Sequence, residues 1–238
     1  DNAISAHQAR TTGIRASRAI HSPDGKYIAF ANRSQLRWVS LQASRDGDVF
    51  EIECGQGLIK DLAWSFTENL VVTVGELGDV RWWDISDSSC LRTIKLPWPK
   101  DIPLEKQKSS SVALSKDGRL CMVGSVCGLL FWFDPSDARS MVCVPAHQGA
   151  VHSVDVAPDG DWAASGGADG VVRVWNLFAG GELAHELKGH AHLVTSVLID
   201  PMGHRVFSAG SDGTFRTWPV SFDLKPESES PISTQTDS

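Results

Sequence analysis

The sequence has one tyrosine against nine tryptophans among its 238 residues, and it is short of positive charge and of long apolar runs. No run reaches the roughly 18 apolar residues that a membrane-spanning helix needs, so no such helix is predicted. It contains 22 Lys and Arg against 29 Asp and Glu, which gives a formal net charge of −7. This balance argues against nucleic acid as the main partner, because binding to the phosphate backbone requires a basic field.

Motifs for catalysis and cofactor binding are also missing. The sequence has neither a glycine-rich phosphate loop nor a dinucleotide fingerprint, so we expect no cofactor. His190 and His192 lie close in sequence, but no carboxylate or cysteine completes a metal site, and we expect no metal. The five cysteines form no CxxC pair and are interpreted as buried free thiols. A location inside the cell, cytoplasmic or nuclear, is therefore expected.

A unit of about 43 residues recurs five times along the chain. Each unit ends in an alternating apolar run that leads to an aromatic residue, at Trp38, Trp83, Phe133, Trp175 and Trp218. Turns of the Asp-Gly type separate the short runs, and this dipeptide favours tight hairpins. Four short antiparallel strands in each unit of this length form a β-propeller blade. The sequence predicts an all-β propeller with about five four-stranded blades, in units near 14–40, 55–85, 109–135, 147–176 and 189–219.

Four residue types recur at identical spacing in the last two units. They are His147, Ser165, Asp169 and Trp175 in the fourth unit, and His190, Ser208, Asp212 and Trp218 in the fifth. On these residues the chain resembles the WD-repeat (WD40) β-propeller family, over about residues 14–220. The resemblance implies a structural hydrogen-bond relay of Trp, Ser, His and Asp. A catalytic triad is disfavoured, because the set occurs twice with a tryptophan and no GxSxG elbow surrounds either serine.

The first three units depart from this pattern. The relay positions of the second unit correspond to Thr73, Leu77 and Trp83, and none of the three units has histidine at the expected place. We therefore expect these blades to depend on apolar packing more than on polar contacts.

The family usually closes its ring with seven blades. We expect the five units to be part of a larger ring that further blades of the same or another chain complete, with a closed five-bladed ring as the alternative. The start at Asp1, without methionine, favours a piece of a longer polypeptide. The propeller is expected over 14–224, after an outer strand or linker at 1–13. Residues 225–238, rich in Ser, Thr, Glu and Pro, are expected to be a disordered tail.

Partner binding is expected at the top face, the end of the blades where each outer strand connects to the next inner strand. The resemblance implies partner-contacting positions near the relay His and Asp of each unit. Carried over to this sequence, they include Arg15, Lys60, Glu76, Lys108, His152, Leu193 and Thr195. The basic residues among them suit an acidic or phosphorylated segment.

A proline-rich insertion between the second and third units adds Trp98 as a further candidate. An exposed tryptophan on a proline-stiffened loop is a plausible interaction anchor. The alternative is that Trp98 folds back onto a neighbouring blade.

These observations predict a non-enzymatic protein–protein interaction scaffold that binds partner proteins or peptides within a multi-protein complex. One alternative is a substrate receptor of a ubiquitin ligase. Such members of the family often carry Trp-Asp-x-Arg after the third strand, and here Trp83-Asp84-Ile85-Ser86 lacks the arginine. A second alternative is an enzyme with its site in the propeller channel, for which the inner strands offer Asp155 and Asp200.

Overall fold

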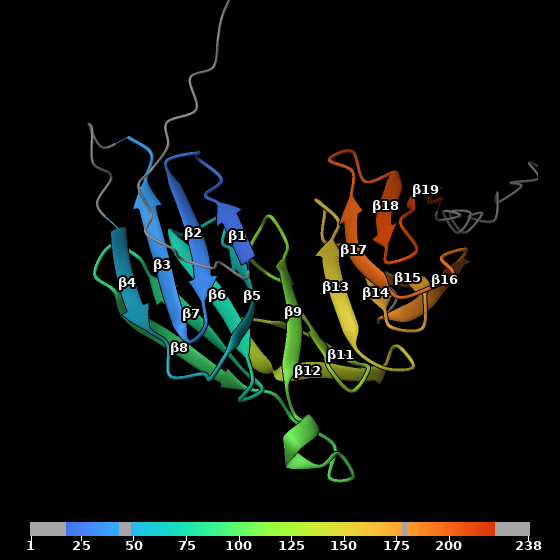
Figure 1. Cartoon of the computed structure of the whole chain (residues 1–238), viewed down its shortest axis with the longest axis horizontal. Helices are drawn as coiled ribbons and strands as arrows, with labels where there is room; N and C mark the ends of the chain where they lie inside the picture. The colour runs from blue at the N-terminus through green and yellow to red at the C-terminus, as the bar shows by residue number, and fades with distance from the viewer. Residues whose placement is uncertain (1–17, 43–48, 178–179, 222–238) are drawn as a thin grey trace, which may run out of the picture.

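The computed structural model describes residues 18–42, 49–177 and 180–221. These residues form five separate antiparallel β-sheets that stand side by side along an arc (Figure 1). Each sheet is one blade, and its strands follow one another in space in the order of the chain. The prediction of an all-β fold built from propeller blades is confirmed, and the five blades do not close into a ring.

The blades have the following strands. Blade 1 contains β1 (Arg18–His21), β2 (Tyr27–Asn32), β3 (Gln35–Ser40) and β4 (Val49–Glu53). Blade 2 contains β5 (Ile59–Trp64), β6 (Leu70–Gly75), β7 (Asp79–Asp84) and β8 (Ser89–Lys95). Blade 3 contains β9 (Ser109–Leu114), β10 (Cys121–Ser125), β11 (Leu129–Asp134) and β12 (Asp137–Pro145). Blade 4 contains β13 (Val151–Val156), β14 (Trp162–Gly167), β15 (Val171–Asn176) and β16 (Glu182–Lys188). Blade 5 contains β17 (Val194–Ile199), β18 (Arg205–Gly210) and β19 (Phe215–Pro219).

Several expectations fall outside the described residues. The N-terminal segment 1–13, the tail 225–238 and the candidate Arg15 belong to this group. Within the described part, no helix is long and apolar enough to cross a membrane. Of the free cysteines, Cys54 and Cys121 are buried as expected, whereas Cys90 is exposed.

The core lies between the blades rather than within any one of them. Each adjacent pair of blades encloses its own cluster of buried apolar side chains. In β6, Val71 packs toward blade 1 and Val72 packs toward blade 3. Because both faces of β6 are covered by neighbouring blades, polar residues do not alternate with apolar ones along this strand, and its sequence is almost entirely apolar.

The register of blade 1 differs from the expected alignment by one residue. Trp38 packs against blade 2, in the same cluster as Trp83. In blade 2 the residue of β7 that faces the following blade is Trp82. Trp38 is therefore the counterpart of Trp82, and Val39 occupies the position of the repeat aromatic residue. The alignment of Trp38 with Trp83 was wrong because both faces of a blade accept a tryptophan at this level.

Two aspartates, the buried Asp61 and the half-buried Asp155, join the inner strands of neighbouring blades. Asp61 on β5 accepts the backbone N–H of Val112 on β9 at 3.0 Å, and the Arg18 guanidinium lies 2.8 Å from its other oxygen. Asp155 on β13 accepts the N–H of Ile199 on β17 at 2.7 Å and that of Val156 at 3.0 Å. Burial raises the pKa of both carboxyl groups, and that of Asp155 reaches about 6.

Loss of the Phe133 ring should destabilise the protein strongly. Phe133 is buried between blades 2 and 3, so the Phe133→Ala variant leaves a cavity that costs about 3–5 kcal/mol. Urea unfolding followed by tryptophan fluorescence measures this change. The matched control is Leu104→Ala at a residue that is 82% exposed, and its effect should stay within about 0.5 kcal/mol. Equal effects in both variants would contradict the interblade core.

Asp155 should give the protein a characteristic dependence of stability on pH. The pKa of Asp155 is raised by burial from 3.8 to about 6, so between these values the folded protein holds a proton that the unfolded chain releases. The contribution of this group to the free energy of unfolding is therefore largest below pH 3.8 and falls as the pH rises through about 6. Denaturation curves between pH 4 and 7 should show that Asp155→Asn removes this part of the slope. An unchanged slope would mean that Asp155 does not titrate in this window.

Candidate functional site

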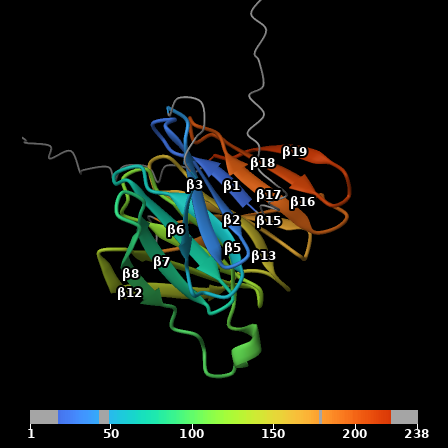
Figure 2. The ribbon, with the colours of Figure 1, turned by 60° about the vertical axis from the view of Figure 1, so that its left-hand side comes forward.

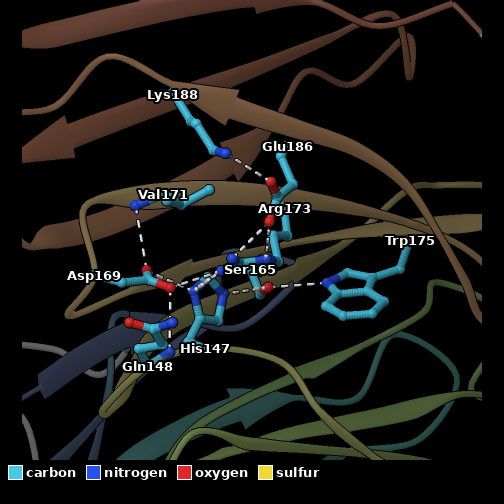
Figure 3. A network of polar contacts seen from close by, with 9 residues as sticks. All are labelled: His147, Gln148, Ser165, Asp169, Val171, Arg173, Trp175, Glu186 and Lys188. Atoms are coloured by element: carbon cyan, nitrogen blue, oxygen red, sulfur yellow. Dashed lines mark hydrogen bonds and ion pairs between the residues drawn. The ribbon is translucent and has the colours of Figure 1, made fainter.

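Blade 4 contains a complete polar relay that ties its loops to its strands (Figure 3). The Trp175 indole donates to the Ser165 hydroxyl at 2.9 Å, and His147 Nε2 lies 2.8 Å from the same oxygen. His147 Nδ1 lies 2.9 Å from Asp169 Oδ1, and the His147 side chain is 0% exposed. The structure thus brings together the four residues that the repeat spacing singles out.

The proton positions in this relay follow from its acceptors. An ionised carboxylate can only accept, so His147 Nδ1 donates to Asp169 and Nε2 accepts the Ser165 hydroxyl proton. Burial lowers the pKa of His147, which keeps the ring neutral at pH 7 despite the neighbouring carboxylate. The pKa of Asp169 is lowered to about 2, because hydrogen bonds from Arg173 and His147 outweigh the effect of its burial. Ser165 is fully buried and its hydroxyl oxygen already accepts the Trp175 indole N–H, so within the blade the four side chains satisfy one another.

Arg173 extends the relay to the outer strand of the blade. Its Nη1 lies 2.7 Å from Asp169 Oδ2, and its Nη2 lies 2.7 Å from Glu186 Oε1. Lys188 approaches the other Glu186 oxygen at 2.9 Å (Figure 3). The sequence analysis missed Arg173, although a signal exists: an arginine stands two residues before the relay tryptophan in blades 2, 4 and 5, at Arg81, Arg173 and Arg216.

Blade 5 repeats the arrangement. Trp218 Nε1 and His190 Nε2 each lie 2.8 Å from the Ser208 hydroxyl. His190 Nδ1 lies 3.1 Å from Asp212 Oδ2. The pKa of Asp212 is lowered, because the N–H groups of Thr214 and Ala191 stabilise the carboxylate more than desolvation disfavours it.

Blade 2 also contains a relay, contrary to the expectation that it depends on apolar packing. Buried Gln56 takes the place of histidine: its amide nitrogen donates to Asp79 Oδ1 at 2.9 Å, and its amide oxygen accepts the Thr73 hydroxyl. Trp83 Nε1 donates to Thr73 at 2.8 Å. An amide offers a donor and an acceptor, as a neutral imidazole does. The sequence analysis looked for histidine and placed the acid at Leu77, two residues before Asp79.

The predicted partner-binding residues of blades 2 and 3 gather at one end of these blades. Lys60 Nζ lies 3.4 Å from Glu76 Oε1, and the Leu58 N–H points at the other oxygen of Glu76 at 3.4 Å. Against the effect of desolvation, these groups and the positive charge of Lys108 lower the pKa of Glu76. Lys60 therefore pairs with this carboxylate on the top face, and the positive charge of Lys108 acts on it as well.

The insertion that joins β8 to β9 projects from the same face (Figures 1 and 2). It contains a short 3₁₀ helix, η1 (Leu104–Lys106), in which Leu104 is largely exposed. Trp98 folds back from this loop: its indole donates to the Gly78 carbonyl at 3.2 Å and its ring packs edge-on against Phe131 at 5.0 Å. Trp98 is therefore not an exposed anchor: it folds back onto the neighbouring blades, and its indole fixes the loop to them.

The remaining candidates lie on blades 4 and 5. His152 and Leu193 are half-buried, and the exposed Thr195 donates its hydroxyl to the Ala209 carbonyl at 3.0 Å. A role of these residues in partner binding stays a prediction.

In the described residues four sheets have four strands and blade 5 has three, and the inner strands of neighbouring sheets lie side by side. Three blades also contain a relay of Trp, hydroxyl, His or Gln, and Asp. These features define a β-propeller of repeated blades. The sequence model of the family described as WD domain, G-beta repeat matches residues 139–176 and 181–219, which cover blades 4 and 5. This part of the chain therefore consists of WD repeats.

Curated relatives agree with this assignment. WD repeat-containing protein 3 of Mus musculus is 25% identical over 69% of this chain and 17% of its own length. WD repeat-containing protein 1 of Xenopus tropicalis is 26% identical over 71% of this chain and 28% of its own length. U3 small nucleolar RNA-associated protein 15 of Schizosaccharomyces pombe is 33% identical over 40% of this chain and 19% of its own length. The chain thus spans less than a third of each of these relatives.

The relay of blade 2 can be tested with a nearly isosteric substitution. Thr73→Val removes the hydroxyl that pairs with Trp83 and Gln56, and it leaves buried polar groups without partners. We expect a loss of about 1–3 kcal/mol in the free energy of unfolding. The same substitution at exposed Thr93 is the control and should cost less than about 0.5 kcal/mol. If the two variants are equally stable, the relay does not contribute to the fold.

Proposed function

We propose that this chain is a non-enzymatic interaction module that binds partner proteins or peptides through its top face within a multi-protein complex. The observation that carries the proposal is the mixed surface formed by blades 2 and 3. There Lys60 pairs with Glu76, and the positive charge of Lys108 acts on the same carboxylate. Exposed Leu77 and Leu104 lie on the adjoining loops. Exposed apolar side chains beside unburied charges are typical of sites that bind another protein.

The rigidity of these loops supports the proposal. A Cβ atom at Gly78 would clash with the Gln107 carbonyl and the Trp98 ring, so the β6–β7 and β8–β9 loops touch at this glycine. Preformed loops lose little conformational entropy when a partner binds. We infer that the partner segment is acidic or phosphorylated and carries an apolar residue, because the charges of two lysines act on a single carboxylate.

The aspartates considered for a channel enzyme have other roles in the structure. Asp155 accepts hydrogen bonds from backbone N–H groups of the inner strands β13 and β17. Asp200 Oδ1 accepts the backbone N–H groups of His204 and Arg205 at 2.6 and 2.9 Å in the β17–β18 turn. These contacts favour an interaction module over an enzyme. For the ubiquitin-ligase alternative, no contact among the described residues adds support.

The name of one relative supports a proposal about where in the cell this chain works. This relative is named for association with a small nucleolar RNA. This name supports our proposal that the chain works inside the cell, in the cytoplasm or the nucleus.

Binding to a peptide library tests the function. We expect the folded chain to select acidic peptides, and the double substitution Lys60→Ala and Lys108→Ala to weaken their binding by up to about 1 kcal/mol for each lysine. The matched control is Lys116→Ala with Arg119→Ala, which removes the same charge from the β9–β10 turn at the opposite end of blade 3. Selection of basic or uncharged peptides, or equal weakening by the control, would contradict the proposed surface.

We also propose that a further blade, of the same or another chain, packs on blade 5. The position three residues before the repeat aromatic residue is fully buried in blades 2, 3 and 4, at Val80, Leu130 and Val172. Its counterpart in blade 5, Phe215, is 68% exposed and stacks on Phe207 at 5.8 Å. Leu198 on the same sheet is exposed as well. In the inner blades this face is covered by the next sheet.

A pair of glutamate substitutions tests whether this face is open. Phe215→Glu should change the stability of the chain by less than about 0.5 kcal/mol and reduce binding of a hydrophobic dye. Val172→Glu places the same charge at the equivalent covered position and should prevent stable folding. If Phe215→Glu is as damaging as Val172→Glu, the face is already buried in the chain itself.

A further inference from the structure

A hollow of about 380 Å³ lies at the bottom face, the end of the blades opposite to the top face. The β1–β2 turn of blade 1 and the β5–β6 turn of blade 2 form its two walls. Among its lining residues are three aromatic and three charged side chains, Tyr27, Trp64, Phe66, Asp24, Lys26 and Glu68.

The aromatic lining of this hollow is particular to blades 1 and 2, where Trp64 and Tyr27 also pack against the core between the two blades. Trp64 and Tyr27 stack at 6.3 Å with nearly parallel rings, and Phe66 is 50% exposed at the rim. The positions that correspond to Trp64 and Phe66 are Leu114 and Lys116 in blade 3. Since the other blades fold without these rings, packing of the repeat does not require an exposed phenylalanine here.

Glu68 lies in the β5–β6 turn, at a position where the equivalent turn of blade 3 has a glycine. In blade 3, Asp117 caps the turn by accepting the Ser115 hydroxyl at 2.6 Å, and Gly118 follows with a positive φ of 74°. In blade 2 the corresponding residues are Thr67 and Glu68. The Glu68 side chain is exposed and makes no ion pair with the described residues.

The remaining charges of the hollow neutralise each other. Lys26 Nζ lies 3.1 Å from Asp24 Oδ2. The Ser22 hydroxyl, which donates to Asp24, and the Lys26 N–H lower the pKa of that carboxyl to about 2, so it is ionised at neutral pH. Glu68 is thus the unpaired charge, and the hollow has one net negative charge beside an exposed aromatic ring.

We propose that this hollow binds the side chain of an arginine from a partner protein. A guanidinium group is planar and stacks on aromatic faces, and its N–H groups pair with a carboxylate in a fork. Phe66 provides the ring and Glu68 the carboxylate, while the stacked Tyr27 and Trp64 line the apolar stem. The net charge of −7 attracts such a basic partner over long range. This site lies at the opposite end of the blades from the proposed top-face surface and takes a ligand of opposite charge.

Titration with the tripeptide acetyl-Gly-Arg-Gly-amide tests the site, with the uncharged citrulline tripeptide as the ligand control. In NMR spectra of the intact chain, we expect the arginine peptide to shift the Trp64 indole N–H resonance with a dissociation constant in the millimolar range. Glu68→Gln and Phe66→Leu should each weaken this binding by about two- to fivefold. Glu105→Gln, an equal charge change on the top-face insertion, should leave it unchanged.

Both test positions are exposed, so the variants should fold, and the dispersed indole resonances of the nine tryptophans verify this. The proposal is overturned if Trp64 does not respond at tens of millimolar peptide. It is also overturned if the citrulline peptide binds equally well. An unchanged affinity in both Glu68→Gln and Phe66→Leu would exclude the hollow as the binding site, whatever happens at the top face.

Discussion

The packing of one blade face against the next is the interaction on which the rest of the structure depends. A single four-stranded sheet of this size cannot bury its apolar residues alone, so Val71 and Val72 on one strand serve two different interfaces. Buried Asp61 and half-buried Asp155 add backbone contacts between the inner strands, and desolvation raises the pKa of both carboxyl groups. The same constraint explains why the apolar face of blade 5 stands out as unusual.

The polar relays act on a second level, because they fix loops onto sheets that already pack. His147 and Gln56 perform the same task with different chemistry: each accepts from a hydroxyl and donates to an aspartate. What the relay requires is a buried group with one donor and one acceptor, not an imidazole as such. Blades 2, 4 and 5 therefore tie a top-face loop to the sheet by the same kinds of hydrogen bond, although the family's sequence model matches only blades 4 and 5.

The propeller fold and the relays of blades 4 and 5 were predictable from the spacing of residues in the sequence, because turns and aromatic residues that recur about every 43 residues are compatible with few folds. The errors arose where different residues can satisfy one physical requirement. Trp38 was shifted by one position because adjacent positions face opposite interfaces and both accept tryptophan, as Trp82 and Trp83 show. The packing of Trp98 on Phe131 is a tertiary contact between a loop and a strand, and no local pattern in the insertion encodes it.

The proposed binding residues lie where the chain departs from its own repeat. In blades 4 and 5 the polar residues of the motif are occupied by one another, so they have little left for a partner. In blade 2, Glu68 stands where other turns have glycine, and the insertion after β8 adds exposed Leu104 beyond the repeat length. A side chain that the fold does not use is free to evolve contacts with a ligand. The divergent blades, which the family model does not match, are therefore the part of this propeller in which specificity is expected to lie.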